Sequence, residues 1–518
     1  MIVRFMTCAS LFLTCLSLGE SAKILGVFST PAKSHLIIHM SVMRALVEQG
    51  HDVTVFTTLP LEDKVKKYRH IQVGLPNMLS KEKMVEMAKE KVEKPKNFLF
   101  EYQDILPKML FVSNYTINSM EFKSLLNESF DLVVLGYFLN DFQLGIAAHF
   151  KCPVVVNFMI QPFTQLLDMS GTPKEISYVP NLFTGLQQPM GFTDRLYNFV
   201  YSGILEPVVY KWGEWQQEKM YRYNFPESKY PSLSEVKKNV SLVLINHHFS
   251  QGGLRPLPPG MVEIGGIQIK EKPNPLPEDI KEFLDESKNG VVYFSFGSHV
   301  ASGSLRPEIT KAMFNVLSKI PFNVLWKWDD SAPVPGTSDN IMYKPWTPQD
   351  DVLAHPNVKL FISHGGQGGV VEAEYHGVPL LICSFFGDQH ANKDLVIKKE
   401  FGRGFPFKTL TEEIFRKEVL EILENPKYSE NIKKFSSVYR DRPMTAKQTA
   451  VFWIEYVIRH KGAFHMQSPL VHLNFFQQHS LDVLGFLAVS LIVLLKVCCV
   501  FICFIKRKLS SGNKLKVL

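Results

Sequence analysis

Cysteine is scarce in this chain and unevenly placed. Of seven cysteines in 518 residues, two fall in an apolar run near the N-terminus and three in an apolar run near the C-terminus. Only Cys152 and Cys383 remain for the body of the protein, which excludes a framework of disulfides. Packed cores must therefore stabilise the fold. A chain of this length, with 46% hydrophobic residues, is long enough for two or more domains.

The body of the chain also lacks an excess of either charge. The formal net charge is +7, but six basic residues lie near the C-terminus: Lys496, Lys506, Arg507, Lys508, Lys514 and Lys516. Removing these six from +7 leaves +1 for the rest. Binding to nucleic acid requires a basic face, which a nearly neutral surface does not offer. We therefore expect no nucleic-acid partner.

Residues 1–22 have the layout of a cleavable secretory signal. Arg4 precedes an apolar run at 5–18, and the small residues Gly19 and Ser21 follow it. The alternative is an N-terminal membrane anchor, but the run is short for a span. Cleavage near residue 22 would place the following chain in the lumen of the secretory pathway.

A second apolar run, at 483–505, is about as long as the roughly 20 residues that a transmembrane helix needs. Lys506, Arg507 and Lys508 follow it, as expected for a cytosolic flank. Lys496 within the run is unfavourable, and a buried core helix is the alternative. We expect a single-pass type I protein with lumenal domains, a transmembrane helix at 483–505 and a basic cytosolic tail at 506–518.

Two further patterns agree with this topology. Lys514 and Lys516 have the spacing of a dilysine address for the endoplasmic reticulum membrane, although chance could produce the match in so basic a tail. Asn114, Asn127 and Asn239 each begin a pattern for N-glycosylation, and all three fall on the expected lumenal side. We therefore expect a glycoprotein of the endoplasmic reticulum.

Strands and helices alternate in two regions, which predicts an α/β protein. In the first, strand-like runs at 23–29 and 52–58 flank a helical run at 35–49, and the rhythm returns at 131–158. A stretch rich in proline, lysine and glutamate separates it from a second alternation that begins at residue 290. We expect two doubly wound domains, 23–265 and 290–465, joined by a linker at 266–289 and facing a cleft.

Two segments, 64–94 and 161–230, do not follow this rhythm. We expect them to be helical insertions in the first domain, and the second is rich in aromatic residues. Such a patch could line an apolar pocket or touch the membrane surface, whereas ordinary helix packing is the alternative for any single residue.

A glycine-rich turn follows the predicted strand at 359–363. The sequence His364-Gly365-Gly366-Gln367-Gly368-Gly369 leads into a helix, where backbone N–H groups and the helix dipole favour a phosphate. Tight turns also need glycine, so the neighbouring residues carry the argument. Trp346 offers a face for a base, Glu372 a carboxylate for a ribose, and Asp388 and Gln389 partners for sugar hydroxyls. Core packing for Trp346 and a solvated helix face for Glu372 are the alternatives.

These residues in this spacing resemble the signature of the UDP-glycosyltransferase family. The matching segments include Trp346 to Gln349, His364 to Glu372, His376 to Pro379 and Asp388-Gln389. The likeness extends over nearly the whole chain, including Pro31 to His35 and Ser295 to Ser298, and is strongest to the membrane-bound insect members.

The resemblance implies the GT-B fold, in which two Rossmann-like domains bind acceptor and UDP-sugar respectively. It implies that Trp346 stacks on uracil, Gln349 bonds the base and Glu372 holds the ribose. The remaining donor residues that it implies are Ser298, His364, Gly366, Gly368 and Gly369 for the diphosphate, and Asp388 and Gln389 for the sugar.

The resemblance also implies that His35 is the general base for an acceptor hydroxyl, a task that suits an imidazole near neutral pH. An ordinary residue at the start of a helix is the alternative. Mammalian relatives orient this base with an acid where Gly136 stands here. Asp141 is the candidate replacement, and capping of the next helix is its alternative role. Gly368 is a second departure, because many relatives carry a side chain there that contacts the phosphates.

The chain contains no Asp-x-Asp triplet, so we expect no metal and no cofactor, with UDP-sugar as a co-substrate. The resemblance implies inverting transfer of a hexose, with glucose as the expected sugar, to a hydroxyl of a small lipophilic acceptor. Glucuronosyl transfer is one alternative. A membrane-tethered binding protein with weak or no turnover is another. The sequence leaves the oligomeric state open, a homo-oligomer included.

Overall fold

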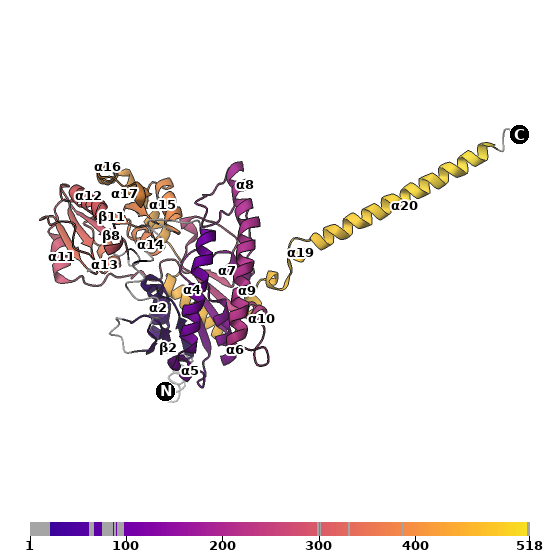
Figure 1. Ribbon diagram of the computed structural model, residues 1–518, viewed down its shortest axis with the longest axis horizontal. Coiled ribbons are helices and arrows are strands. Elements are labelled where there is room, and N and C mark those ends of the chain that lie inside the picture. Colours follow the sequence, from indigo (N-terminus) through magenta and orange to yellow (C-terminus); the bar gives the residue numbers. More distant parts are fainter. Residues whose placement is uncertain are drawn as a thin grey trace, which may run out of the picture. The chain divides into compact units, whose positions relative to one another are not determined.

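The computed structural model describes residues 21–61, 67–74, 86, 90, 98–297, 300, 302–329, 332–385 and 387–514 (Figure 1). The predicted secretory signal, Ser298 and the last residues of the tail lie outside this part of the chain. Contacts divide the chain into two units, residues 1–467 and residues 468–518. The first unit holds two parallel sheets, and the second holds a long apolar helix.

The first sheet has the strand order β3-β2-β1-β4-β5-β6-β7, and every neighbouring pair is parallel. The sheet is built from strands that are mostly buried on both faces, as parallel strands between helices must be. Their bounds are β1 Lys23–Phe28, β2 Asp52–Thr57, β3 Arg69–Gln72, β4 Leu132–Gly136, β5 Val154–Phe158, β6 Val240–Ile245 and β7 Met261–Glu263.

The first strand-helix-strand unit follows the predicted pattern. Helix α2 spans Lys33–Glu48, and its buried side includes Leu36, Met40, Met43 and Val47. Gly50 has a φ of +91°, a conformation that glycine adopts at little cost, and it turns the chain into β2. Helix formation by this apolar stripe therefore places the loop 29–32 at the carboxyl end of β1.

The second sheet has the order β10-β9-β8-β11-β12-β13 and is also parallel throughout. Two buried apolar clusters cover its faces. The strands are β8 Val291–Ser295, β9 Asn323–Lys327, β10 Ile341–Lys344, β11 Val358–Ser363, β12 Leu380–Ser384 and β13 Gly402–Pro406. The prediction of two doubly wound α/β domains is confirmed.

Helices connect these strands. Those that bear on the site or on its supports are α4 Phe98–Asn118, η2 Asp141–Leu144, α6 Gly145–Phe150, α7 Thr164–Ser170, α10 Leu233–Lys238, α12 Pro307–Leu317, α13 Gln349–Leu353, α14 Gln367–His376 and α15 Gln389–Lys398.

The expectation of a purely helical insertion at 64–94 is wrong for residues 69–72. They form β3, which pairs with β2 at the edge of the first sheet. Its short and mostly polar sequence suits an edge strand, so no apolar run marks it. Most of the remaining insertion lies outside the described residues.

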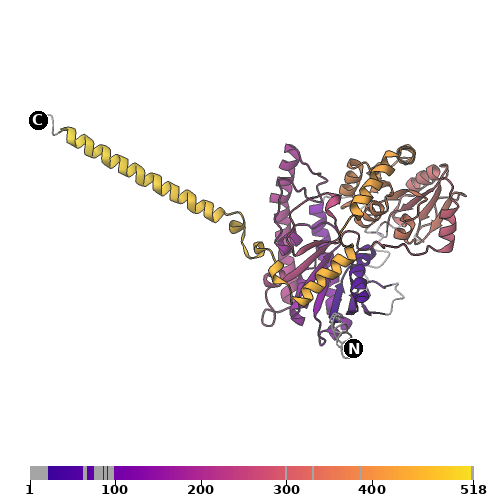
Figure 2. The same ribbon diagram turned by 180° about the vertical axis from the view of Figure 1, so that it is seen from behind.

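Two helices pack where the sequence pattern does not place them. Helix α11, Glu278–Asp285, lies inside the expected linker, yet its buried Ile280 and Leu284 join the core of the second sheet. Helix α18, Ala446–Arg459, ends the second domain in sequence but packs on α2 and β6 of the first sheet, as seen from behind (Figure 2). The chain therefore returns to its first half after completing the second.

The insertion at 161–230 is helical at 164–170 and 192–224, but the expectation of a helical insertion is wrong for residues 171–191, which form turns and irregular loops. It includes α8 Phe192–Val200, a π-helical turn at Tyr201–Leu205 and α9 Glu206–Asn224, which runs beside α4 (Figure 1). Its aromatic residues divide into two groups. Tyr201, Tyr210 and Tyr221 are buried, whereas Tyr197, Phe199 and Trp215 are exposed, so ordinary core packing accounts for only part of the aromatic content.

Helix α20, Leu481–Lys514, belongs to the second unit. Residues 481–508 form the one helix in the described part of the chain that is long and apolar enough to cross a membrane, with a mean hydropathy of 2.9 in its best window. None of that window is buried by protein. This helix contains the predicted span at 483–505.

Candidate functional site

The carboxyl ends of β11 and β12 carry the glycine-rich turn and the acid-amide pair. His364 follows β11, and Gly366 caps α14. Gly365 has a φ of +86°, which favours glycine over any residue with a Cβ. The first backbone N–H groups of α14 have no partners within the helix, so its N-terminus is a suitable place for an anion.

His364 is held between two glycine loops. A Cβ atom on Gly297 would lie 2.7 Å from Cε1 of His364, and one on Gly366 would lie 2.5 Å from Nε2. Both distances are too short for a Cβ unless the His364 ring shifts, and Gly297 also has a φ of +74°, which favours glycine. The loop after β8 and the turn after β11 can therefore close on the ring from two sides.

Gly368 and Gly369 differ in their surroundings. A Cβ on Gly369 would lie 3.3 Å from Nε2 of Gln349, which is tight. Among the residues that the structure describes, none has an atom within 4 Å of a Cβ on Gly368.

Trp346, Gln349 and Glu372 come together beside this turn. Gln349 Nε2 donates to Glu372 Oε2 at 2.6 Å, and Tyr293 OH donates to Gln349 Oε1 at 3.3 Å. Trp346 is 46% exposed, which leaves ring surface for a ligand. Burial raises the pKa of Glu372 to about 8, and Asp350 contributes to the shift in the same direction.

Asp388 and Gln389 stand at the start of α15 and face the glycine-rich turn. Asn392 Nδ2 donates to Asp388 Oδ2 at 3.1 Å and to the Gly365 carbonyl oxygen at 2.9 Å, linking the two segments. Burial raises the pKa of Asp388 to about 6. Gln389 is buried, and its Oε1 accepts from the backbone N–H of Phe385 at 2.9 Å.

The structure thus brings all the described donor candidates to one edge of the second sheet. It adds residues that the sequence did not reveal. Tyr293 fixes Gln349, and two lysines lie over the Trp346 ring: Lys33 Nζ at 3.7 Å from the ring centroid and Lys327 Nζ at 5.8 Å. Tyr293 lies in β8, whose sequence indicates only a buried strand, and Lys33 belongs to the first domain. No local sequence pattern therefore predicts a role for Tyr293 or Lys33 at this site.

His35 lies in the first turn of α2, at the carboxyl end of β1. Its Nδ1 is 3.3 Å from Thr30 Oγ1, and its ring contacts Phe138 at 5.4 Å between centroids. Thr30 Oγ1 also accepts from the Ala32 backbone N–H at 3.1 Å. If His35 carries its proton on Nδ1, it donates to Thr30 and presents a basic Nε2.

Asp141 does not contact His35. Its Oδ1 accepts from Tyr137 OH at 2.6 Å, and its Oδ2 pairs with Lys237 Nζ at 2.5 Å. The Asp141 side chain is 3% exposed and that of Lys237 is 22% exposed, so the pair is largely buried. Nor does Asp141 cap η2, which begins after Asn140 with no side-chain cap. Its carboxylate is already neutralised by Lys237.

The region around Gly136 explains why no acid stands there. A Cβ on Gly136 would lie 2.7 Å from Phe28 and 2.8 Å from Nε2 of His39. His39 is one helical turn after His35 and stacks on Phe28 at 5.0 Å. It is 1% exposed, and burial lowers its pKa to about 3. A neutral imidazole thus fills the space next to the end of β4.

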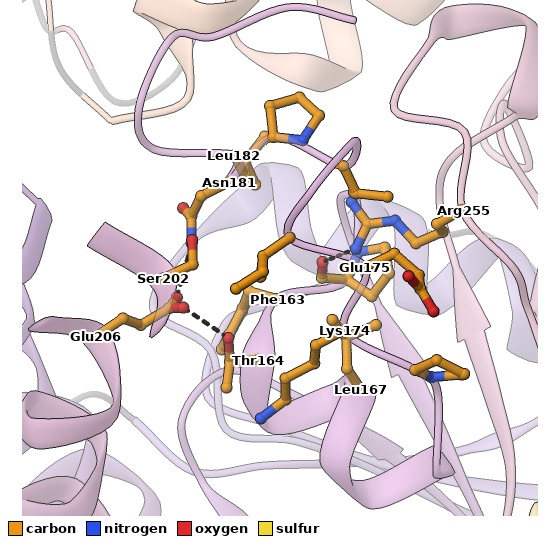
Figure 3. Close-up of a pocket in the computed structure, with 15 residues that line it drawn as sticks. Phe163, Thr164, Leu167, Lys174, Glu175, Asn181, Leu182, Ser202, Glu206 and Arg255 are labelled. Atoms are coloured by element: carbon orange, nitrogen blue, oxygen red, sulfur yellow. Dashed lines mark hydrogen bonds between the residues drawn. The ribbon is translucent and has the colours of Figure 1, made fainter. Parts of the chain in front are cut away.

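A cavity lies at the carboxyl ends of β5 and β6 (Figure 3). Its walls are largely apolar: Phe163, Leu167, Ile176, Val179 and Leu182. Glu206 and Arg255 approach it from opposite sides (Figure 3). Burial raises the pKa of Glu206, which accepts from Thr164 and Asn181. The cavity, of about 50 Å³, has room for a few water molecules.

The three glycosylation patterns differ in accessibility. Asn127 and Asn239 are exposed. Asn114 is half-buried within α4, and its Oδ1 accepts from Asn118 and Asn224. Asn127 and Asn239 are therefore better placed than Asn114 to carry a glycan. Cys152 and Cys383 are both free thiols.

Comparison with known proteins gives a consistent result. The family model for UDP-glucoronosyl and UDP-glucosyl transferase matches residues 22–515. UDP-glycosyltransferase UGT5 of Dactylopius coccus is 36% identical over 487 residues, covering 92% of this chain and 91% of that protein. UDP-glucuronosyltransferase 2B33 of Macaca mulatta is 30% identical over 505 residues, covering 93% of each.

A solved structure agrees at the level of the fold. The crystal structure of the glycotransferase of kitacinnamycin has a TM-score of 0.54 to this chain at 14% identity. The match covers 84% of this chain and 99% of that one. Both have the GT-B arrangement of two parallel-sheet domains.

Proposed function

Because this chain belongs to the UDP-glycosyltransferase family, we propose that it transfers glucose from UDP-glucose to a hydroxyl of a small lipophilic acceptor, with inversion at the anomeric carbon. The observation that carries the proposal is the meeting of Trp346, Gln349, Glu372 and the N-terminus of α14 at one edge of the second sheet. A UDP-sugar needs these groups together.

On the donor side, the exposed Trp346 ring stacks on uracil and Gln349 bonds the base. Glu372 accepts from the ribose hydroxyls. The diphosphate lies at the N-terminus of α14, near His364 and the N–H groups of Gly366, Gly368 and Gly369. Ser298 lies outside the described residues and stays a prediction. Helix dipole and oriented donors stabilise the departing UDP.

Asp388 and Gln389 hold the transferred sugar at the start of α15. The link through Asn392 to the Gly365 carbonyl keeps this acid close to the phosphate site. Both sugars under consideration offer hydroxyls to such a pair, so these residues do not choose between glucose and glucuronic acid.

On the acceptor side, His35 is the proposed general base. An acceptor hydroxyl becomes a good nucleophile when a base removes its proton during attack. The Thr30 contact orients the ring, and Nε2 is the basic atom in the tautomer that carries its proton on Nδ1. Attack on the anomeric carbon from the side opposite to UDP gives inversion.

The acceptor pocket is proposed to include the cavity beside Phe163 and Arg255. Apolar walls that also carry the charged residues Lys174, Glu175, Glu206 and Arg255 suit a small amphipathic molecule. Since the cavity holds only a few water molecules as it stands, the loop 171–182 and the start of α9 have to move apart when an acceptor enters.

The proposed location is the endoplasmic reticulum membrane, with α20 as a single span and the sheets in the lumen. The support is the apolar length of α20, the basic residues after it and the predicted signal at 1–22. Glycans at Asn127 and Asn239 would accompany this orientation.

A direct test uses microsomes that carry the full chain and a panel of phenols and lipophilic alcohols. Parallel reactions with UDP-glucose and UDP-glucuronic acid identify the sugar. Faster product formation from UDP-glucose supports the proposal. Exclusive use of UDP-glucuronic acid would show that the transferred sugar is glucuronic acid and not glucose.

A binding protein with weak turnover is the second candidate. The observation that favours it is the pairing of Asp141 with Lys237, which leaves His35 without that carboxylate. Binding of UDP with no product from any acceptor, in the same microsomes, would favour this candidate.

A further inference from the structure

Lys33 makes a contact between the first and second domains at the proposed donor site. It is the first residue of α2, two positions before His35, and follows β1 of the first sheet. Its ammonium group lies 3.7 Å from the ring centroid of Trp346, which follows β10 of the second sheet. An ammonium this close lies against the indole face. A residue of the first domain therefore contacts the aromatic ring that is proposed to stack on uracil.

A second ammonium group approaches the same ring. Lys327, the last residue of β9, lies 5.8 Å from the Trp346 centroid and donates to the Gly297 carbonyl oxygen at 2.8 Å. Burial lowers the pKa of Lys327, and Lys33 lowers it further, while Asp329 acts in the opposite direction. The two cations are thus close enough to repel each other.

Two like charges that converge from different domains favour an anion between or beside them. Gly297, which accepts from Lys327, also touches His364, and His364 leads into the N-terminus of α14. The cations therefore border the place proposed for the diphosphate. A phosphate oxygen also attracts an ammonium group more strongly than a partly exposed indole face does.

We infer that Lys33 is a further donor-binding residue, whose ammonium group leaves the Trp346 face and contacts the diphosphate when a UDP-sugar binds. The inference rests on the proposed function for the donor site. Departure of Lys33 frees the indole face for uracil, and its charge then ties the first domain to the donor held by the second.

The test is calorimetric titration of the full chain in detergent with UDP and, separately, with uridine. Lys33→Met removes the charge and keeps most of the side-chain length, whereas Lys33→Arg keeps the charge. Lys219→Met is the matched control, because Lys219 lies 5.6 Å from the exposed Trp215 ring on α9 in a similar cation–ring contact. Uridine has the base and ribose but no phosphate.

We expect Lys33→Met to weaken UDP binding about tenfold, the effect of one charge-assisted hydrogen bond. Uridine binding should stay the same or tighten, which also shows that the variant is folded. Lys33→Arg and Lys219→Met should bind UDP within about threefold of the wild type. Raising the salt concentration should narrow the difference between wild type and Lys33→Met for UDP.

Unchanged or tighter UDP binding by Lys33→Met would overturn the inference, because Lys33 would then only cover the ring. Equal losses for UDP and uridine would overturn it too, since the effect would not involve phosphate. These outcomes are separate from failure of the proposed function, which appears as UDP binding by the wild type without sugar transfer.

Discussion

The imidazole of His39 occupies the space that a side chain on residue 136 would need. A Cβ on Gly136 would lie 2.8 Å from Nε2 of His39, and the ring is buried and neutral. The His39 side chain in the second turn of α2 thus packs directly against the backbone of Gly136 at the end of β4. An acid at residue 136 therefore requires the side chains of Phe28 and His39 to shift.

Gly136→Asp should therefore destabilise the protein. Crowding against Phe28 and His39 costs about 1 to 3 kcal/mol, and a carboxylate beside a neutral ring adds to this. Denaturant unfolding measures the loss. The double variant Gly136→Asp with His39→Ala should recover part of it, because the contact with the imidazole is removed while the contact with Phe28 remains. A single variant as stable as the wild type would contradict the fit described above.

Asp141 and Lys237 should behave as a structural ion pair. Removing one partner of a largely buried pair leaves an uncompensated charge, so Asp141→Ala should lower stability by about 3 to 5 kcal/mol. The fraction that stays folded should keep the wild-type pH profile of kcat, since Asp141 has no contact with His35.

Lys237→Met is the matched variant, because it breaks the same pair from the other side. A shifted pH profile in Asp141→Ala but not in Lys237→Met would show instead that the carboxylate acts on the base.

Glu372 should make donor binding depend on pH. Burial raises its pKa to about 8, so below that pH most of the unliganded protein carries the protonated acid. The carboxylate form accepts from both ribose hydroxyls, so binding favours loss of the proton. Affinity for UDP-glucose should rise about tenfold between about pH 7 and about pH 8.5.

Calorimetry of wild type and Glu372→Gln in parallel checks this expectation. UDP-glucose is the suitable ligand because its diphosphate does not titrate in this range. The amide variant should bind more weakly and show no such rise. A rise of equal size in both proteins would contradict the assignment to Glu372.

Gly368→Asn should strengthen donor binding. No atom of the described residues lies within 4 Å of a Cβ at this position, so the side chain fits without displacing any of them. An added hydrogen bond to phosphate is worth about 1 kcal/mol, or about fivefold in affinity for UDP. Gly369→Asn is the control, because its Cβ would crowd Gln349 and Phe361. Weaker UDP binding by Gly368→Asn would contradict the open space.

The donor side could be predicted from the sequence because its parts are local. The turn at His364 to Gly369 follows an apolar strand and opens a helix, so its place at the sheet edge follows from the pattern alone. Glu372 lies on the same helix as the turn. The partners of Asp141 and Trp346 could not be predicted, because Lys237 and Lys33 lie far away in sequence and no periodic pattern links them.

The edge strand β3 and the return of α18 to the first sheet were also missed. Strand β3, residues 69–72, is short and mostly polar. Its pairing with β2 depends on backbone hydrogen bonds, which no side-chain pattern predicts. The sequence of helix α18 shows that one face is apolar, but it does not show which sheet that face packs against. The structure shows that it packs on the first sheet.

The central claim is that His35 activates an acceptor hydroxyl for attack on a UDP-sugar bound by the second domain. The most direct measurement compares wild type and His35→Ala for glycoside formation from UDP-glucose and a lipophilic phenol, with UDP binding measured on the same preparations. The account predicts an inverted glycoside from the wild type. It predicts at least a roughly hundredfold loss of kcat in His35→Ala with unchanged UDP binding. Turnover that persists in His35→Ala would contradict it.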